Sequence, residues 1–517
     1  MRDIMNMKKL FNLLCHRSVI VGVSIVIQAL VLVAVLLRFM NYFVYFYAIC
    51  LLASLVAVVY LVNNRSNPAY KIIWIIMINS FPIFGGLFYL MFGGNRLTIR
   101  QRVKMKKVEE RLRQNWHPDR EAIARLEKES PGAAGQSRYL QQYALCSPYQ
   151  NTSVEYLPLG EKKWERMLEE LKKAEHFIFM EYFIIQEGKM WDPILEILAQ
   201  KAKEGLDVRL VYDDVGCLMT LPKNYAKKME SLGIKCCVFN PFVPRLNVKM
   251  NNRDHRKICV IDGYVGFTGG INLADEYINA YPKHGHWKDV SVMLKGDAVW
   301  NLTAMFLSVW DYIRPQEEDW DAFRPGVYQK EPVPSDGYVQ PYGDSPQDGE
   351  TVGENVYLNL ISKAQRYVYI CTPYLIVDNE MVTILSNAAK CGVDVRIMTP
   401  HHADKWYVHA VTRAYYQCLL EAGVKIYEYT PGFVHAKSFV SDDQYATVGT
   451  INLDYRSLYL HFECGCWMYR CSCIADMKQD YLDTLAVSQE ITLEECRAVP
   501  WYRKVGRSLL RLIAPLM

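Results

Sequence analysis

The sequence predicts an α/β fold in which an N-terminal transmembrane helical hairpin precedes two pseudo-symmetric α/β repeats that share one active-site cleft. Three observations support this prediction: long uncharged stretches near the N-terminus, short apolar runs that alternate with helix-like stretches, and a polar motif that occurs twice. The 517 residues are enough for a membrane anchor and two repeats of ordinary domain size.

The N-terminal region, residues 1–95, is interpreted as the membrane anchor. Residues 18–37 and 39–64 carry no formal charge, and only Arg38 separates them, so they predict an antiparallel pair of spans. A third uncharged stretch, residues 72–95, contains Pro82 and Gly85-Gly86. Basic residues flank the N-terminus, the second stretch and the third. The positive-inside rule therefore favours a re-entrant or interfacial third segment, with the catalytic domain on the cytoplasmic face of the cell membrane.

A basic juxtamembrane connector, residues 96–150, follows the anchor. It opens with a run of Arg and Lys residues without an acidic one, although the formal net charge of the whole chain is only +4. Such a cluster attracts anionic headgroups at the bilayer surface, and it equally serves as a topology signal.

Two halves, residues 151–330 and 331–517, follow the connector and resemble each other. Residues 177–180 correspond to 367–370, and Gly205–Val211 corresponds to Gly392–Met398. Each half is predicted to run strand, helix, strand, helix, strand and motif strand. Residues 315–350, rich in Pro, Gly, Asp and Gln, are the expected connection.

The repeated motif is H-x-K-x4-D, and each copy is followed by a Gly-x-x-Asn segment. The first copy contains His255, Lys257 and Asp262, and the second contains His435, Lys437 and Asp442. Supporting residues in the following segments are Gly269 and Asn272 in the first half and Thr450 and Asn452 in the second. Two copies in one frame indicate a duplication that kept its polar residues.

These residue types suit chemistry on a phosphodiester. A neutral histidine can attack phosphorus, and a second, protonated histidine can protonate the leaving alkoxide. The lysines would hold the non-bridging oxygens, with Asn272 and Asn452 as neutral donors. This scheme needs no metal and no cofactor.

Four carboxylates accompany the motifs. Asp289 follows His255 and Glu463 follows His435, each at the start of a predicted strand. Either could accept from Nδ1 of a histidine and fix its tautomer, and the alternative is a surface ion pair. Asp262 and Asp442 complete the motifs, but their odd spacing favours a scaffold role over proton transfer. His176 and His401 are interpreted as core histidines.

The paired motifs resemble those of the phospholipase D superfamily and, within it, of bacterial cardiolipin synthases. The similarity is carried by Asp254–Lys257 with Thr268–Tyr277, and by Gly432–Lys437 with Val448–Ser457. The resemblance implies two phospholipase D-like repeats and His255 as the nucleophile. It also implies phosphatidyl transfer between two molecules of phosphatidylglycerol, an anionic phospholipid of the bilayer, to give cardiolipin and glycerol.

Other functions remain open at this level. A phospholipase D hydrolase or a transferase for another alcohol is the nearest alternative. A nucleic-acid phosphodiesterase is disfavoured by the anchor and by Gly269-Gly270, and a non-catalytic lipid-binding protein is disfavoured by the intact motifs. The sequence does not determine the oligomeric state.

Two further patterns complete the chain. The fifteen cysteines are scattered, which argues against a disulfide framework, and the Cys464, Cys466, Cys471 and Cys473 cluster fits a buried strand better than zinc. Residues 501–513 predict a basic amphipathic helix that either lies on the membrane or docks on the core.

Overall fold

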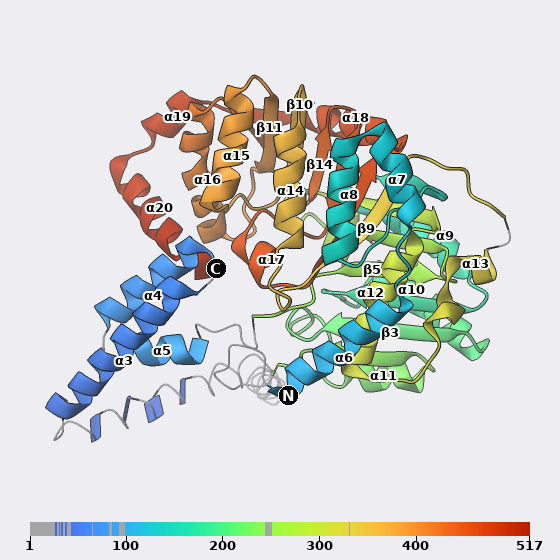
Figure 1. Cartoon of the computed structure of the whole chain (residues 1–517), viewed down its shortest axis with the longest axis horizontal. Coiled ribbons are helices and arrows are strands. Elements are labelled where there is room, and N and C mark those ends of the chain that lie inside the picture. Colours follow the sequence, from blue (N-terminus) through green and yellow to red (C-terminus); the bar gives the residue numbers. More distant parts are fainter. Residues whose placement is uncertain are drawn as a thin grey trace, which may run out of the picture. The chain divides into compact units, whose positions relative to one another are not determined.

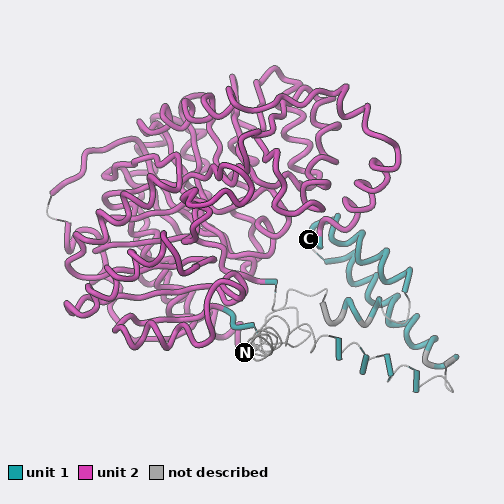
Figure 2. Tube along the Cα trace, turned by 180° about the vertical axis from the view of Figure 1, so that it is seen from behind, with its two compact units in different colours: residues 1–97, 240–251, 516 teal, residues 98–239, 252–515, 517 magenta. Residues whose placement is uncertain are grey.

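A computed structural model (Figure 1) describes ten segments of the chain: residues 26–27, 30–31, 33–34, 37–38, 43–64, 66–81, 85–92, 99–242, 251–329 and 331–516. The chain divides into two compact units (Figure 2). The N-terminal unit comprises residues 1–97, 240–251 and 516, and the large unit comprises residues 98–239, 252–515 and 517.

The N-terminal unit contains three described helices, α3 (Phe43–Asn63), α4 (Pro68–Ser80) and α5 (Gly85–Phe92). Asn67 caps α4 by accepting from the backbone N–H of Ala69. The chain reverses between α4 and α5, since the rings of Trp74 and Tyr89 meet edge to face with centroids 5.4 Å apart.

This reversal falls within the third uncharged stretch, where the sequence predicts a bend. Among the helices that the structure describes, none combines the length and the apolar character needed to cross a membrane. Most of the first uncharged stretch, residues 18–37, lies outside the described residues.

The large unit is built on two mixed sheets. The strands of the first half are β1 (Thr152–Leu157), β2 (Phe177–Tyr182), β3 (Asp207–Asp213), β4 (Lys235–Phe239), β5 (Lys257–Ile261), β6 (Val265–Gly269), β7 (His286–Lys288) and β8 (Ser291–Gly296). Those of the second half are β9 (Tyr338–Asp344), β10 (Tyr367–Cys371), β11 (Asp394–Pro400), β12 (Lys425–Tyr429), β13 (Gly432–Val434), β14 (Ser438–Ser441), β15 (Tyr445–Gly449), β16 (Glu463–Tyr469) and β17 (Ser488–Ile491).

The helices connect and cover these strands. The first half contains α9 (Gly160–Lys173), α10 (Trp191–Lys203), α11 (Tyr225–Ser231), η3 (Asp275–Ile278) and α12 (Val299–Ile313). The second contains α14 (Val352–Lys363), α15 (Asn379–Lys390), α16 (Trp406–Glu421), α17 (Tyr455–Tyr459), α18 (Cys473–Ala486), α19 (Leu493–Ala498), α20 (Trp501–Ile513) and η5 (Ala514–Leu516). The connecting segments contain α6 (Ile99–Asn115), α7 (Arg120–Glu129), α8 (Pro131–Tyr143), η4 (Trp320–Phe323) and α13 (Pro325–Tyr328).

The two sheets repeat one topology. The first has the order β1-β8-β6-β5-β2-β3-β4, and the second has the order β17-β12-β11-β10-β14-β15-β16-β9. In each, three parallel strands adjoin two antiparallel motif strands: β2-β3-β4 with β5-β6, and β10-β11-β12 with β14-β15. The predicted duplication of an α/β unit is confirmed by this correspondence.

Apolar residues on both faces of the first sheet explain its continuous hydrophobic strands. One face packs on α9 and α10, where Met180 meets Met167 and Trp191 in a single buried cluster. On the opposite face, Phe179 stacks on Phe306 of α12 with ring centroids 4.7 Å apart. The sheet is therefore covered by helices on both sides, as Figure 1 shows.

The expected connection, residues 315–350, is not irregular throughout. Its second part forms β9, the edge strand that pairs antiparallel with β16. Pro341 is tolerated there because β9 has a neighbouring strand of the sheet on one side only. Pro and Gly within residues 338–344 mimic a loop in the sequence, so the prediction is wrong for this part.

Candidate active site

The two motif histidines lie just before the motif strands. β5 begins at Lys257 and β14 begins at Ser438, so His255 and His435 each precede a strand. Neither histidine belongs to the regular strand that follows it. Both histidines are buried, at 7% exposure each.

His255 is oriented by a carboxylate from the other half of the chain. Its Nδ1 lies 2.9 Å from both carboxylate oxygens of Glu463, the first residue of β16. Its backbone N–H donates to the carbonyl of Phe462 at 2.9 Å. The segment that supplies the carboxylate therefore also holds the histidine backbone.

His435 has the reciprocal arrangement. Its Nδ1 lies 2.7 Å from Oδ2 of Asp289, and its backbone N–H donates to the carbonyl of Lys288 at 2.7 Å. Strands β7 and β13, which lead into this site from the two halves, pair in parallel. The surface ion-pair alternative is excluded for both carboxylates, because Asp289 and Glu463 are completely buried.

The two motifs therefore meet in one site. A histidine with Nδ1–H bonded to a carboxylate presents Nε2 as its free nitrogen. Burial lowers the pKa of His255 to about 3, although Glu463 acts in the opposite direction. Burial and the neighbouring Lys437 lower the pKa of His435 to about 4, against the opposing effect of Asp289. Both imidazoles are therefore neutral near pH 7.

The two lysines are also buried and curl back onto their own histidines. The Nζ of Lys257 donates to the carbonyl of His255 at 2.5 Å, and the Nζ of Lys437 donates to the carbonyl of His435. Burial lowers the pKa of Lys257 to about 8 and that of Lys437 to about 7. The positive charge of Lys257 also lowers the pKa of Lys437, so the two lysines from the two halves influence each other electrostatically.

Asp262 and Asp442 lie at the far ends of the motif strands and outside this group. The Asp262 carboxylate accepts from the backbone N–H groups of residues 175–177, each at 2.8 Å. Asp442 accepts in the same way from residues 365–367. Each aspartate fixes the entry into a central parallel strand. These backbone contacts are those of a scaffold residue, the role that the sequence favours for both aspartates.

The two asparagines, predicted to be neutral donors to the phosphate, have different surroundings. Asn272 accepts from the backbone N–H of Ile184 at 3.0 Å and donates to the Tyr277 hydroxyl at 2.7 Å. Its amide oxygen and one of its two N–H groups therefore hold a loop, and the donor role stays a prediction. Asn452 is buried, and its Oδ1 has no hydrogen-bond partner within the part of the chain described.

The residues that follow the two motifs differ because they lie against different carboxylates. A side chain at Gly269, which has a φ of 148°, would collide with the backbone of Ser291. A Cβ at Gly270 would lie 2.1 Å from Oδ1 of Asp289, so glycine leaves room for that carboxylate. The equivalent Thr450 instead donates its hydroxyl to Glu463.

Sequence reasoning missed His461, which lies beside the His255–Glu463 pair. Its ring centroid is 5.7 Å from that of His255, and its Nδ1 is 3.8 Å from Oε1 of Glu463. His461, His255 and Glu463 are close enough to hold a metal ion, but hydrogen bonding already accounts for the His255–Glu463 pair. His461 lies two residues before Glu463 in the sequence, and this proximity could have identified it as a residue of the site.

The remaining sequence predictions have mixed outcomes. Cys464, Cys466, Cys471 and Cys473 are buried, and burial raises the pKa of each thiol.

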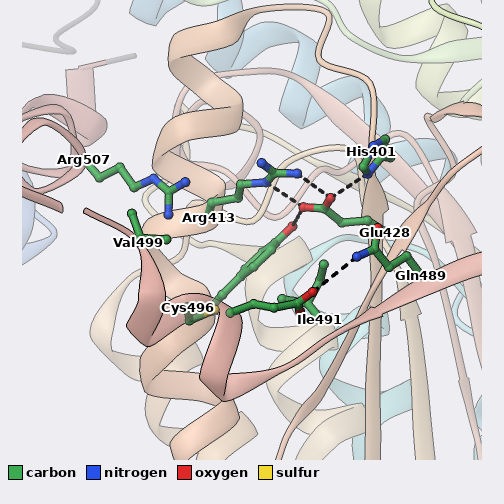
Figure 3. A pocket seen from close by; sticks show the side chains of 10 residues that line it. His401, Arg413, Glu428, Gln489, Ile491, Cys496, Val499 and Arg507 are labelled. Carbon is green, nitrogen blue, oxygen red and sulfur yellow. Dashed lines mark hydrogen bonds and ion pairs between the residues drawn. The ribbon is translucent and has the colours of Figure 1, made fainter. Parts of the chain in front are cut away.

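The expectation that His176 and His401 are core histidines is wrong. His176 is exposed and stacks on Tyr328, and His401 is half-buried and bonded to Glu428. A pocket that includes His401 lies outside the His–Lys site (Figure 3).

Known proteins resemble the chain over most of its length. The family profile described as "Cardiolipin synthase, PLD-like domain" matches residues 167–290 and 357–483. A second profile, "Phospholipase_D-nuclease N-terminal", matches residues 52–94. The first profile therefore matches both halves and includes both histidines.

Similar curated proteins come from several bacteria. An uncharacterized protein of Streptococcus mutans is 45% identical over 89% of this chain and 99% of its own. Cardiolipin synthase of Halalkalibacterium halodurans is 33% identical over 89% of this chain and 92% of its own. Cardiolipin synthase 2 of Bacillus anthracis is 35% identical over 90% of each chain.

A solved structure shares the fold. Phosphatidylserine synthase of Haemophilus influenzae superposes with a TM-score of 0.56 at 13% identity, covering 71% of this chain and 95% of its own. At this identity the similarity concerns the fold alone.

Proposed function

Because the chain belongs to the cardiolipin synthases with phospholipase D-like domains, we propose that it transfers a phosphatidyl group between two phosphatidylglycerol molecules to give cardiolipin and glycerol. The observation that carries this proposal is the pair of buried histidines, each bonded through Nδ1 to a carboxylate of the other half. Two imidazoles with free Nε2 atoms supply the nucleophile and the acid that a two-step transfer requires.

The proposed reaction has two balanced steps. Nε2 of His255 attacks phosphorus of the first lipid; a P–N bond forms, the P–O bond to glycerol breaks, and His435 gives its proton to the glycerol oxygen. The headgroup hydroxyl of the second phosphatidylglycerol then attacks phosphorus and gives its proton to His435, while the P–N bond breaks. The low pKa of His255 keeps its imidazole neutral, which a nucleophile requires.

His435 must carry a proton for the first step, although its pKa without substrate is about 4. An anionic phosphodiester beside the imidazole favours the charged form and raises that pKa. Protonation is thereby coupled to the binding of the phosphate, while Asp289 stabilises the imidazolium through Nδ1.

Lys257 and Lys437 are proposed to hold the non-bridging phosphate oxygens, which predicts a dependence on pH. Below pH about 7 both ammonium groups are charged, and they lose their protons as the pH rises through about 7 to 8. We expect kcat/KM, which reports the free enzyme, to decline over this range. Lys437→Arg keeps its charge and should move the decline to higher pH. A profile that stays flat to pH ~10 would contradict this role.

Labelled phosphatidylglycerol tests the function directly. Incubated with the purified full-length protein, it should yield labelled cardiolipin and free glycerol, and added glycerol should suppress net synthesis by driving the reverse reaction. Phosphatidate as the main product would instead indicate a hydrolase. A lipid-binding protein without catalysis would leave the substrate unchanged.

We also propose that residues 1–95 anchor the protein as a multi-pass segment, with 96–150 as the connector and 151–330 and 331–517 as the two repeats on the cytoplasmic face. The absence of formal charge across residues 18–37 and 39–64 supports the anchor. Full-length protein should remain with membranes after alkaline carbonate extraction. Protease added outside intact spheroplasts should leave the repeats uncut. Release by carbonate would contradict the anchor, and cleavage would contradict the orientation.

A further inference from the structure

The C-terminal helix α20 packs on the large unit with its basic side and leaves its apolar side exposed. It contacts α16 and lies at the outer edge of the unit (Figure 1). Trp501 is 76% exposed and Leu509 is 62% exposed. The exposed large apolar residues of the helix are Trp501, Tyr502, Val505, Leu509, Leu512 and Ile513. At 3.6 residues per turn these positions form one continuous face.

Two of the basic residues on the other side of α20, Lys504 and Arg511, contact the protein. The Nζ of Lys504 donates to the carbonyl of Arg497 at 2.9 Å. The guanidinium carbon of Arg511 lies 4.2 Å from the centroid of the Tyr415 ring.

The third inward-facing cation, Arg507, borders a polar pocket instead of an apolar core. Figure 3 shows Arg507 directed from α20 toward Arg413 of α16. The pocket has a volume of about 220 Å³, and Arg413 donates to both carboxylate oxygens of Glu428 on its wall. Burial and the charge of Arg413 lower the pKa of Arg507. The side of α20 that faces α16 therefore carries charged groups.

This orientation is the reverse of the usual one. A surface helix of a globular protein buries its apolar stripe and exposes its charges. Here the large apolar side chains contribute little to packing on the large unit, although their exposure to water is unfavourable. The apolar face therefore requires another apolar environment.

We propose that the apolar face of α20 inserts into the interfacial layer of a bilayer that contains anionic phospholipid, and so docks the second repeat on the membrane. Trp501 and Tyr502 open the helix, and these are the residue types that favour the headgroup level. The helix has no acidic residue, and Arg503, one of its four basic residues, is exposed. An exposed cation without a neighbouring acid on the helix is compatible with an anionic lipid surface.

This inference is independent of the proposed reaction and of the N-terminal anchor. It assigns a second membrane contact, made by the large unit itself. Such a contact would keep the second repeat near the headgroups whatever reaction the site performs.

Photo-crosslinking in the full-length protein tests the occupant of this face. p-Benzoylphenylalanine is placed at Leu509 on the apolar face, or at Arg503 on the opposite side of the same helix as the matched control. Each protein is reconstituted in phosphatidylglycerol-containing vesicles, irradiated and analysed by mass spectrometry of the C-terminal peptide. A thermal unfolding midpoint equal to that of the unsubstituted protein shows that each variant is folded. We expect lipid adducts at position 509, and several-fold fewer at position 503.

Three other results would overturn the proposal. Crosslinks from position 509 to residues 26–92 would show that the face packs on the N-terminal unit. Crosslinks to a second copy would show an oligomer contact. Equal lipid labelling at both positions, or none, would show that the apolar face has no preferred contact with the bilayer.

Discussion

His255→Ala and His435→Ala are each expected to lower the turnover of phosphatidylglycerol by about 10⁴-fold or more. Each half-reaction uses both imidazoles, one bonded to phosphorus and the other moving the proton, so neither can substitute for the other. Labelled cardiolipin formed per unit time is the measurement. His176→Ala is the matched control, because this imidazole is exposed and stacks on Tyr328 outside the site. Retention of more than a few per cent of activity by either site variant would refute the two-histidine mechanism.

A substrate with a good leaving group separates the two roles. If glycerol is replaced by p-nitrophenol, departure of the aryloxide needs little protonation, so His435→Asn should still form the P–N bond. Mass spectrometry after rapid quenching should then find the phosphatidyl group on His255. An adduct on His435 in His255→Asn, with none on His255 in the reciprocal variant, would reverse the assignment.

Glu463→Gln and Asp289→Asn are expected to lower overall turnover by about 10² to 10⁴-fold, because each removes the charge that fixes the tautomer of one histidine. Their effects on the p-nitrophenyl substrate should differ. Glu463 contacts His255, so Glu463→Gln should suppress the initial burst of nitrophenolate. Asp289 contacts His435, so Asp289→Asn should largely preserve that burst and slow the second step.

This contrast tests the exchange of carboxylates between the halves. If each histidine used the carboxylate of its own half, the burst would be lost in Asp289→Asn and kept in Glu463→Gln. Glu494→Gln, an exposed carboxylate on α19, is the control and should leave both phases unchanged. Thermal unfolding midpoints separate a local effect from loss of the fold, since removing a buried charge also affects stability.

Much of the fold and of the candidate site could be predicted from local patterns. The alternation of apolar runs identified strands such as β2 and β10, because a buried strand needs a short continuous apolar segment. The duplicated motif identified His255 and His435 as one functional set, since two halves of one topology present equivalent positions. β9 escaped prediction because Pro341 and Gly343 resemble loop residues unless the edge position of the strand is known.

The sequence by itself determined the repeat, the residues of the two motifs and the two carboxylates that accompany them. It could not determine that Glu463 serves His255 and that Asp289 serves His435, because that choice depends on how two separately folded sheets meet. Likewise, the pattern of α20 specifies an apolar and a basic side but not which side faces the protein. Only contacts between residues far apart in the chain, such as Arg511 on Tyr415, decide that orientation.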